Sequence, residues 1–167
     1  MRGRLFALAL ALSGGVFGIA GAVMQEVRGL PDPFVAGPLI EEAVKPAGLY
    51  LLLYRWPHLL GGRRYTAGLA ALGGLAFGLV EAAVYVTVYV PEPSLGFVVY
   101  RFTLPLALHS LASFIYGQGI DGRLAAWVRG EGSLKATGWR FFVAAVVLHG
   151  LYNVGAVIAG VAGLQPK

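Results

Sequence analysis

Cysteine is absent from this sequence, and charged residues are scarce. Without cysteine the chain can form no disulfide, no thiolate metal site and no thiol nucleophile. Only 13 basic and 8 acidic residues occur among 167, which is 13% of the chain and about half of the roughly 25% usual for soluble domains. Intrinsic disorder is also excluded, because disordered chains combine low hydrophobicity with high charge. Hydrophobic residues make up 57% of the sequence, and this composition is typical of a membrane protein.

The distribution of charge argues against a protein that binds nucleic acid. The net charge is +5, but the basic residues form no cluster with interleaved aromatic side chains. The length allows one domain, so we expect a single transmembrane domain over residues 1–167. The sequence predicts an all-α fold, a polytopic membrane helix bundle of about five transmembrane helices.

Apolar segments long enough to cross a bilayer, which needs about 20 residues, locate these helices. The five predicted spans cover residues 5–24, 38–54, 66–90, 96–120 and 136–164. The second span is the shortest and carries the most charge. Residues 121–135 are predicted to form a short interfacial turn or helix around Trp127.

Basic residues in the loops and near the ends of the spans fall almost entirely on one side of the membrane. That side holds the N-terminus and the loops after the second and fourth spans, with Arg2, Arg4, Arg55, Arg63, Arg64, Arg123, Arg129, Lys135 and Arg140. The opposite side has only Arg28 and Lys167. The positive-inside rule therefore predicts a cytoplasmic N-terminus. The first segment also imitates a signal peptide ending at Ala20-Gly21-Ala22, but its apolar run is long for a signal core, and we favour a span.

Charged side chains inside spans cost about 3 kcal/mol each near the helix centre and are usually functional. In the second span, Lys45 lies one turn after Glu41 and Glu42 and can neutralise only one of the two carboxylates. A salt-bridged helix start near the membrane surface is one interpretation, and a general base is the one we favour. Pro46 is expected to break the helix here, because it removes the hydrogen bond to the carbonyl of Glu42.

Two further charged residues lie in the third and fourth spans. Glu81 is about 14 Å from the end of its span and can form an ion pair with Arg101 or Lys45, tune a site, or do both. Arg101 lies about one turn into its span, and we expect its side chain to snorkel to the membrane surface.

Two histidines lie on different spans at similar depths. His109 and His149 are about 18 and 21 Å from the extracytoplasmic face by helix rise, so one site can include both. Asn153 follows His149 by one turn and adds a donor and an acceptor beside the imidazole. Glu41 and Glu42 can join this site only if residues 30–37 dip into the protein before the second span begins.

Four motifs occur in order on four successive spans. They are Glu41-Glu42-x-x-Lys45, Phe77-x-x-x-Glu81, an isolated His109, and His149-x-x-x-Asn153. Over residues 38–153 the sequence resembles the PrsW family of intramembrane proteases, which is related to the CAAX prenyl protease superfamily and to the scaffold subunit of gamma-secretase. The spacing departs from that of the CAAX proteases, because Glu81 stands where they have a histidine, and a prenylated substrate is therefore not expected.

The resemblance implies an intramembrane endopeptidase that hydrolyses a peptide bond in or beside the membrane. It implies that Glu41 and Glu42 activate water and that Glu81 orients or tunes the site, with Lys45 in support. His109 and His149, with Asn153, would bind that water or stabilise the oxyanion. A divalent metal such as zinc would take its ligands from Glu42, Glu81, His109 and His149, and metal-dependent and metal-free mechanisms both fit these residues.

The resemblance also implies partners and a location. The partners are membrane lipid and a single-span membrane protein substrate such as an anti-sigma factor, and the location is the plasma membrane of a bacterium or archaeon. Two other functions fit the same residues: a proton or ion translocator, since buried Glu and His form proton relays, and a non-catalytic membrane scaffold. A translocator would stagger its polar residues through the full membrane depth, whereas a protease would cluster them in one half.

Overall fold

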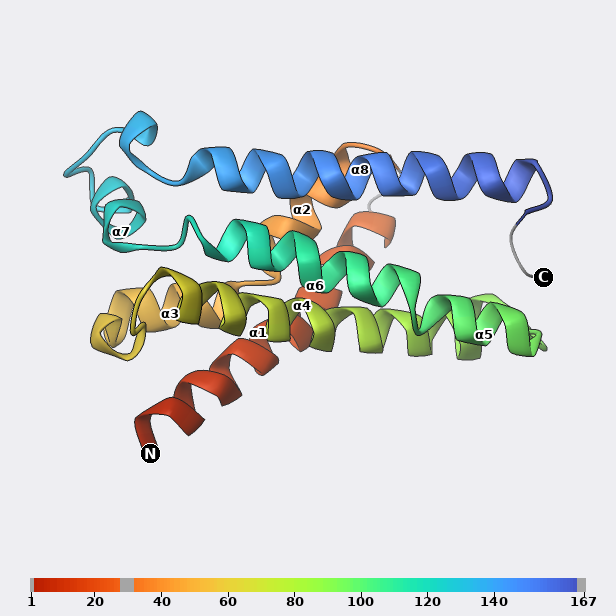
Figure 1. Ribbon diagram of the computed structural model, residues 1–167, viewed down its shortest axis with the longest axis horizontal. Coiled ribbons are helices and arrows are strands. Elements are labelled where there is room, and N and C mark those ends of the chain that lie inside the picture. Colours follow the sequence, from red (N-terminus) through yellow and green to blue (C-terminus); the bar gives the residue numbers. More distant parts are fainter. Residues whose placement is uncertain (1, 28–31, 165–167) are drawn as a thin grey trace.

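A computed structural model describes residues 2–27 and 32–164, and within these ranges the chain forms helices and no strand (Figure 1). The α-helices are α1 (Arg2–Val27), α2 (Ala36–Val44), α3 (Ala47–Arg55), α4 (Arg63–Val84), α5 (Leu95–Arg101), α6 (Leu104–Gly117), α7 (Gly122–Val128) and α8 (Trp139–Val161). Short 3₁₀ turns lie at Pro57–Leu59 and Leu134–Ala136, and a π-helical turn, η2, lies at Tyr85–Tyr89. The predicted all-α helix bundle is confirmed.

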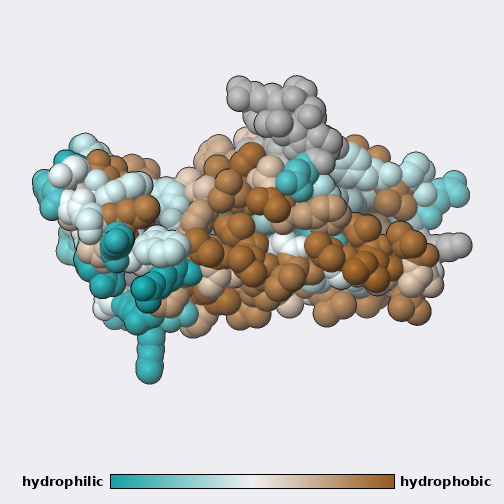
Figure 2. All heavy atoms as spheres, turned by 90° about the horizontal axis from the view of Figure 1, so that it is seen from above, coloured by the Kyte–Doolittle hydropathy of each residue, from teal (hydrophilic) through white to brown (hydrophobic). Residues whose placement is uncertain are grey.

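Four segments are long and apolar enough to cross a membrane. They are Arg2–Ala20, Arg63–Tyr89, Leu95–Gly117 and Trp139–Val161. They match the first, third, fourth and fifth predicted spans. On the face shown in Figure 2, apolar side chains cover the middle of the molecule, whereas polar ones gather at the end that carries α7 and, in smaller number, at the opposite tip. This distribution is the one expected of a bundle whose outer surface contacts lipid.

The second predicted span is not one continuous helix. Residues 36–55 form α2 and α3, nine residues each, joined by a turn at Lys45 and Pro46. Each piece is about 14 Å long, which is less than half of the roughly 30 Å hydrocarbon core. The break falls at Pro46, where the sequence predicted it, because proline cannot donate the helical hydrogen bond.

The segment that leads into α2, here called the dip, lies beside the middle of α8. The Asn153 amide on α8 donates to the Pro33 carbonyl across 2.6 Å. A side chain at Gly150, midway along α8, would collide with the Phe34 carbonyl. Residues 32–35 thus reach the level of the site, as expected, but they run along the surface of the bundle, where all four are exposed, and residues 30 and 31 lie outside the described part of the chain. As a result α2 begins beside the middle of α8 and carries its two glutamates there.

Close helix contacts in this bundle depend on glycine. A Cβ at Gly14 of α1 would lie 2.6 Å from the backbone nitrogen of Gly48 in α3. A Cβ at Gly74 of α4 would collide with the carbonyl of His109 in α6. The small residues of α1 thus pack against helices of the same chain, and those of α4 bring α6 close enough for its histidine to reach α4.

One half of the bundle is filled with apolar side chains. Buried residues of α1, α3, α4 and α6 form its core, among them Ala7, Leu49, Leu52, Leu53, Leu69, Ala112 and Ile120. The Tyr50 and Tyr116 hydroxyls hydrogen-bond across 2.7 Å, and the Tyr116 ring packs on Phe142. We refer to this region as the leucine–tyrosine core.

The leucine–tyrosine core lies toward the basic end of the molecule. The N-terminus, the end of α3, the start of α4, α7 and the start of α8 all lie at this end (Figure 1). Arg123 on α7 and Arg129 just after it form exposed ion pairs with Asp121 and Glu131. The predicted interfacial helix around Trp127 is therefore present as α7. The positive-inside rule predicts that this end is cytoplasmic; Arg28 and Lys167 lie outside the described residues.

Candidate active site

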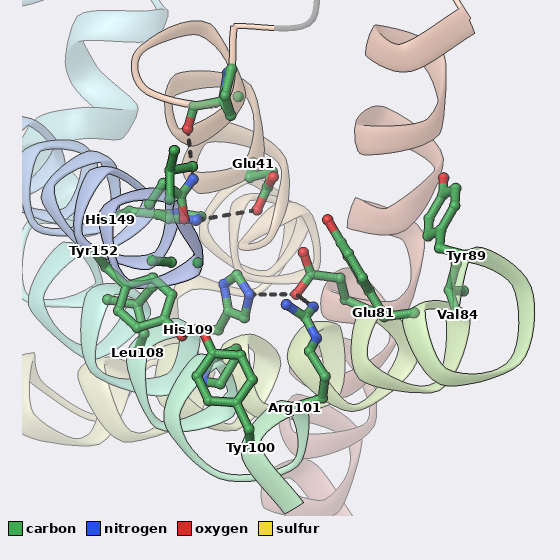
Figure 3. A pocket seen from close by; sticks show the side chains of 18 of the residues that line it. Glu41, Glu81, Val84, Tyr89, Tyr100, Arg101, Leu108, His109, His149 and Tyr152 are labelled. Carbon is green, nitrogen blue, oxygen red and sulfur yellow. Dashed lines mark hydrogen bonds and ion pairs between the residues drawn. The ribbon is translucent and has the colours of Figure 1, made fainter. Parts of the chain in front are cut away.

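The polar residues singled out in the sequence gather where α2, α4, α6 and α8 meet. Glu41, Glu81, His109 and His149 point toward one another from these four helices (Figure 3). The two imidazole rings lie edge to face with their centroids 5.0 Å apart. The dip before α2 makes this meeting possible, because it lowers the glutamates to the level of the histidines.

Glu42 hydrogen-bonds to one histidine and to the lysine that caps the end of its own helix. Its Oε1 atom accepts hydrogen bonds from Lys45 Nζ across 2.6 Å and from His149 Nδ1 across 2.9 Å. Glu42 and Lys45 lie one turn apart on α2 and are fully buried. Because a carboxylate only accepts, His149 carries its proton on Nδ1 and leaves the lone pair of Nε2 available.

The second histidine has both ring nitrogens engaged. His109 Nδ1 lies 2.8 Å from Lys45 Nζ, and its Nε2 lies 2.8 Å from Glu81 Oε2. An ammonium group only donates hydrogen bonds, so Nδ1 accepts and Nε2 donates to the Glu81 carboxylate. The chain of contacts thus fixes both imidazole tautomers, and His149 Nε2 is the ring nitrogen with an available lone pair.

Arg101 turns into the site, and the expectation that it would snorkel to the surface is wrong. Its Nη2 atom donates to Glu81 Oε2 across 3.0 Å, and its guanidinium stacks 3.7 Å from the centre of the Tyr85 ring. The side chain is 11% exposed. Stacking and ion pairing inside the protein replace the headgroup contacts that snorkelling would provide. Of the two partners predicted for Glu81, Arg101 is the one it contacts directly.

The tyrosine of that stack lies where α4 passes into the π-helical turn η2, and its amide still donates to the Glu81 carbonyl. The α-helix of α4 ends at Val84, one turn after Glu81, and η2 follows directly. A π-turn inserts an extra residue into the helical repeat and reorients the side chains that follow, and such turns are frequent at functional sites. Tyr85 and Tyr89 both line the cavity that the turn borders.

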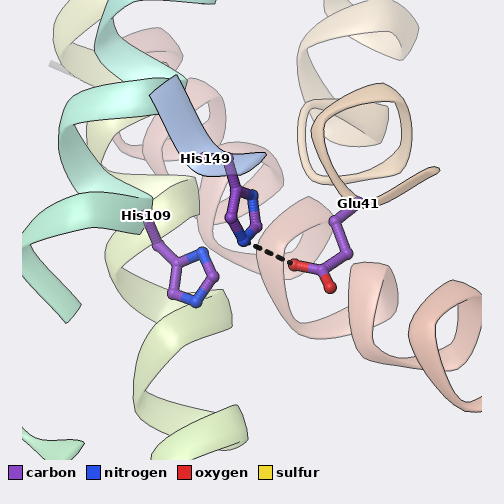
Figure 4. Close-up of side chains that lie close together, drawn as sticks. All are labelled: Glu41, His109 and His149. Carbon is purple, nitrogen blue, oxygen red and sulfur yellow. Dashed lines mark ion pairs between the residues drawn. The ribbon is translucent and has the colours of Figure 1, made fainter. Parts of the chain in front are cut away.

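Glu41 differs from Glu42 in being partly exposed, with 14% of its side chain accessible against 1% for Glu42. Its Oε2 atom has no hydrogen-bond partner, and its nearest polar neighbours are Lys45 Nζ at 3.4 Å and His149 Nε2 at 3.8 Å (Figure 4). The second distance is too long for a direct hydrogen bond, yet short enough for one oxygen atom or one cation to contact both groups. Consecutive residues of a helix point about 100° apart, and this separates the exposed Glu41 from the enclosed Glu42.

A cavity of about 1010 Å³ adjoins this pair. It extends from His149, at the middle of α8, to Val161 at its end, and it is bounded on the other side by η2 and α5. Glu41, Glu81, His109, His149, Asn153 and Arg101 all line it, and Glu42 does not. The cavity therefore opens away from the basic end of the molecule.

Asn153 and a pair of tyrosines shape the cavity wall. The Asn153 amide nitrogen, expected to face the reacting atoms, is used to anchor Pro33. The hydroxyls of Tyr100 on α5 and Tyr152 on α8 hydrogen-bond across 2.9 Å. This tyrosine pair links two helices that border the cavity, and no sequence motif predicted it.

Three side chains can together hold a metal ion. One ligand atom each from Glu41, His109 and His149 lies within 4.8 Å of the other two. Glu41 is in this group, whereas the sequence prediction had Glu42 and Glu81 beside the histidines. The residues fit a divalent cation in two respects: Glu41 Oε2 is buried without a hydrogen bond, and Glu42 holds the far nitrogen of His149, as carboxylates do behind metal-bound imidazoles.

Comparison with known proteins agrees with the site. Residues 3–165, nearly the whole chain, match the family described as PrsW family intramembrane metalloprotease. No curated protein and no solved structure matches the chain. The match extends beyond the motif region at 38–153 and includes the first helix, which carries no motif residue. The chain therefore belongs to the PrsW family of intramembrane metalloproteases.

Proposed function

We propose that Glu41 and His149 are the pair that activates water for peptide-bond hydrolysis, and that Glu42 positions them. One observation carries this division of roles: Glu41 lines the cavity, whereas Glu42 is fully buried behind His149 and does not line it, although the Oε2 atom of each carboxylate lacks a hydrogen bond. A water between Glu41 Oε2 and His149 Nε2 would meet two acceptors, and each can take a proton.

In the proposed reaction, the water oxygen attacks the carbonyl carbon of the substrate as Glu41 takes one of its protons. The carbonyl oxygen becomes an oxyanion, and the C–N bond breaks as a proton from the Glu41–His149 pair reaches the leaving nitrogen. One water is consumed: its hydroxyl group becomes part of the new carboxyl terminus, and its other hydrogen goes to the new amino terminus. Lys45 and Arg101 supply positive charge next to the cavity, which favours the developing negative charge.

A divalent metal would be held by the same glutamate and histidine together with a second histidine. When bound, it would polarise the carbonyl and lower the pKa of its water. Glu41, His109 and His149 are the residues that would hold it, with Glu42 behind His149. With or without metal, the attacking water lies against Glu41 and His149, so substitutions at these residues test the site in either case.

The substrate we propose is a single-span membrane protein. The cavity rim includes apolar side chains that are also exposed on the outside of the bundle, namely Tyr89, Val157 and Val161. A peptide arriving through the lipid can therefore contact apolar side chains at the rim before it reaches the glutamates. An anti-sigma factor is one substrate of this class, as the family resemblance implies, and the plasma membrane of a bacterium or archaeon is the corresponding location.

The clustering of polar groups favours a protease over a translocator. Glu41, Glu81, His109 and His149 lie around one cavity, while the leucine–tyrosine core fills the half of the bundle toward the basic end. A relay would need titratable groups along the full membrane depth.

The experiment compares cleavage of a single-span test protein by the purified enzyme and its variants. Glu41→Gln should lower kcat/KM by about 1,000-fold, as expected when a general base is lost. Glu42→Gln should lower it by about 10- to 100-fold, because an amide oxygen can still accept from His149 Nδ1. Equal losses, or a larger loss for Glu42→Gln, would contradict the proposed roles. Glu131→Gln, at the exposed end, serves as the matched control and should cleave normally.

A further inference from the structure

A lysine ammonium already lies among the groups that would bind a metal. Lys45 Nζ is 2.6 Å from Glu42 Oε1, 2.8 Å from His109 Nδ1 and 3.4 Å from Glu41 Oε2. Its side chain is 1% exposed, and its charge also lies 4.3 Å from the centre of the Phe77 ring. The ammonium is therefore a cation that already contacts two carboxylates and one imidazole of this cluster.

The backbone of Lys45 is clamped, so the reach of its side chain is fixed. Its amide donates to the Glu41 carbonyl across 2.9 Å, and Pro46 follows it directly. On the other side it packs against glycines of α1: a Cβ at Gly14 would lie 3.1 Å from its carbonyl oxygen, and one at Gly18 would lie 3.4 Å from its Cα. The ammonium is thus held at this point by both the backbone and its partners.

The lysine uses a ligand that a metal would need. His109 is one of the three residues of the metal group, and its Nδ1 lone pair accepts from the ammonium while Nε2 donates to Glu81. A divalent ion in the cluster would also repel the ammonium strongly, because charges a few ångströms apart in a buried site are poorly screened. Metal and ammonium therefore compete for one position.

We propose that Lys45 is the resident cation of the active site and that it weakens divalent metal binding at Glu41, His109 and His149. For a metal to bind with all three ligands, the ammonium must leave His109. The inference concerns the same site as the proposed function, but it is tested by metal binding and not by cleavage, so that either can fail without the other.

The test measures binding of Zn²⁺ to purified full-length protein after removal of metal by chelation, using calorimetry. Co²⁺ absorption reports the ligands in parallel. Lys45→Met should bind one zinc per chain at least about 100-fold more tightly than the wild type, since a repelling charge is gone. Lys135→Met makes the same change at an exposed site outside the spans and should bind zinc as the wild type does.

Two further variants make the result decisive. Lys45→Met combined with Glu41→Gln should lose the added affinity, which locates the metal at this cluster. Lys45→Met combined with Glu42→Gln removes one charge of each sign and so keeps the charge balance of the buried site. This double variant replaces the single variant if the latter does not fold. It should also bind zinc more tightly than the wild type. Wild-type affinity equal to that of the lysine variants, or a gain that survives Glu41→Gln, would overturn the proposal.

Discussion

Replacing Gly150 by alanine tests whether the dip before α2 determines the geometry of the site. A Cβ at this position points at the Phe34 carbonyl, which lies against the middle of α8. The oxygen would have to withdraw by about 1 Å to reach an ordinary van der Waals distance. Because α2 begins two residues after Phe34, this displacement is transmitted to the helix that carries Glu41.

The structure sets the size of the expected effect. Adding a carbon atom to a closely packed contact costs about 1–3 kcal/mol of stability. A displacement of about 1 Å at a catalytic group can lower the rate by about 100-fold. We therefore expect Gly150→Ala to lower kcat/KM by about 100-fold while the protein still folds, with a modest fall in melting temperature in detergent.

The same helix offers a matched control. Gly155 is exposed on α8, and a Cβ there would meet nothing within 4 Å. Gly155→Ala should leave kcat/KM unchanged and stabilise the helix by about 0.5–1 kcal/mol, since alanine loses less backbone entropy than glycine. The assays are cleavage of a single-span substrate and thermal unfolding of both variants. If Gly150→Ala cleaves as fast as Gly155→Ala, the dip does not control the position of α2.

Three further substitutions test separate contacts. Asn153→Leu removes the amide that anchors Pro33 and should lower the melting temperature and kcat/KM together, whereas loss of kcat/KM alone would indicate a direct role in the reaction. Arg101→Met should lower kcat/KM by about 10-fold, because Glu81 keeps His109 but loses the other of the two partners that orient it, and unchanged kinetics would show that this ion pair is only structural. Tyr116→Phe leaves a buried tyrosine hydroxyl of α3 unpaired and should cost about 1–3 kcal/mol in unfolding experiments with kcat/KM retained; lost cleavage would show that the leucine–tyrosine core reaches the site.

Local chemistry made much of the fold predictable. Apolar length located four helices, and Pro46 marked the break between α2 and α3 because a proline lacks the donor that a helix needs. Helix rise put His109 and His149 at similar depths, and their rings are neighbours in the structure. The dip before α2 was expected because two glutamates near the surface could not otherwise meet them.

Side-chain direction was less predictable, because it depends on neighbours far apart in the sequence. Arg101 lies near the start of its span, where snorkelling is common, but Glu81 and Tyr85, one helical turn apart at the end of α4, hold its guanidinium inside the protein. The different surroundings of Glu41 and Glu42 depend on how α2 is rotated against α8. That rotation is set by Gly150 and the turn before α2, which no local pattern encodes.

The leucine–tyrosine core has a consequence for the cell as a whole. A hydrolase that admits water to the middle of a membrane risks making a path along which protons and ions leak down their gradients. Here the half of the bundle toward the basic end is filled by leucine side chains and by two tyrosine hydroxyls that satisfy each other. The enzyme can thus admit water to its glutamates from one side, while the filled half of the bundle on the other side keeps the membrane impermeable to ions.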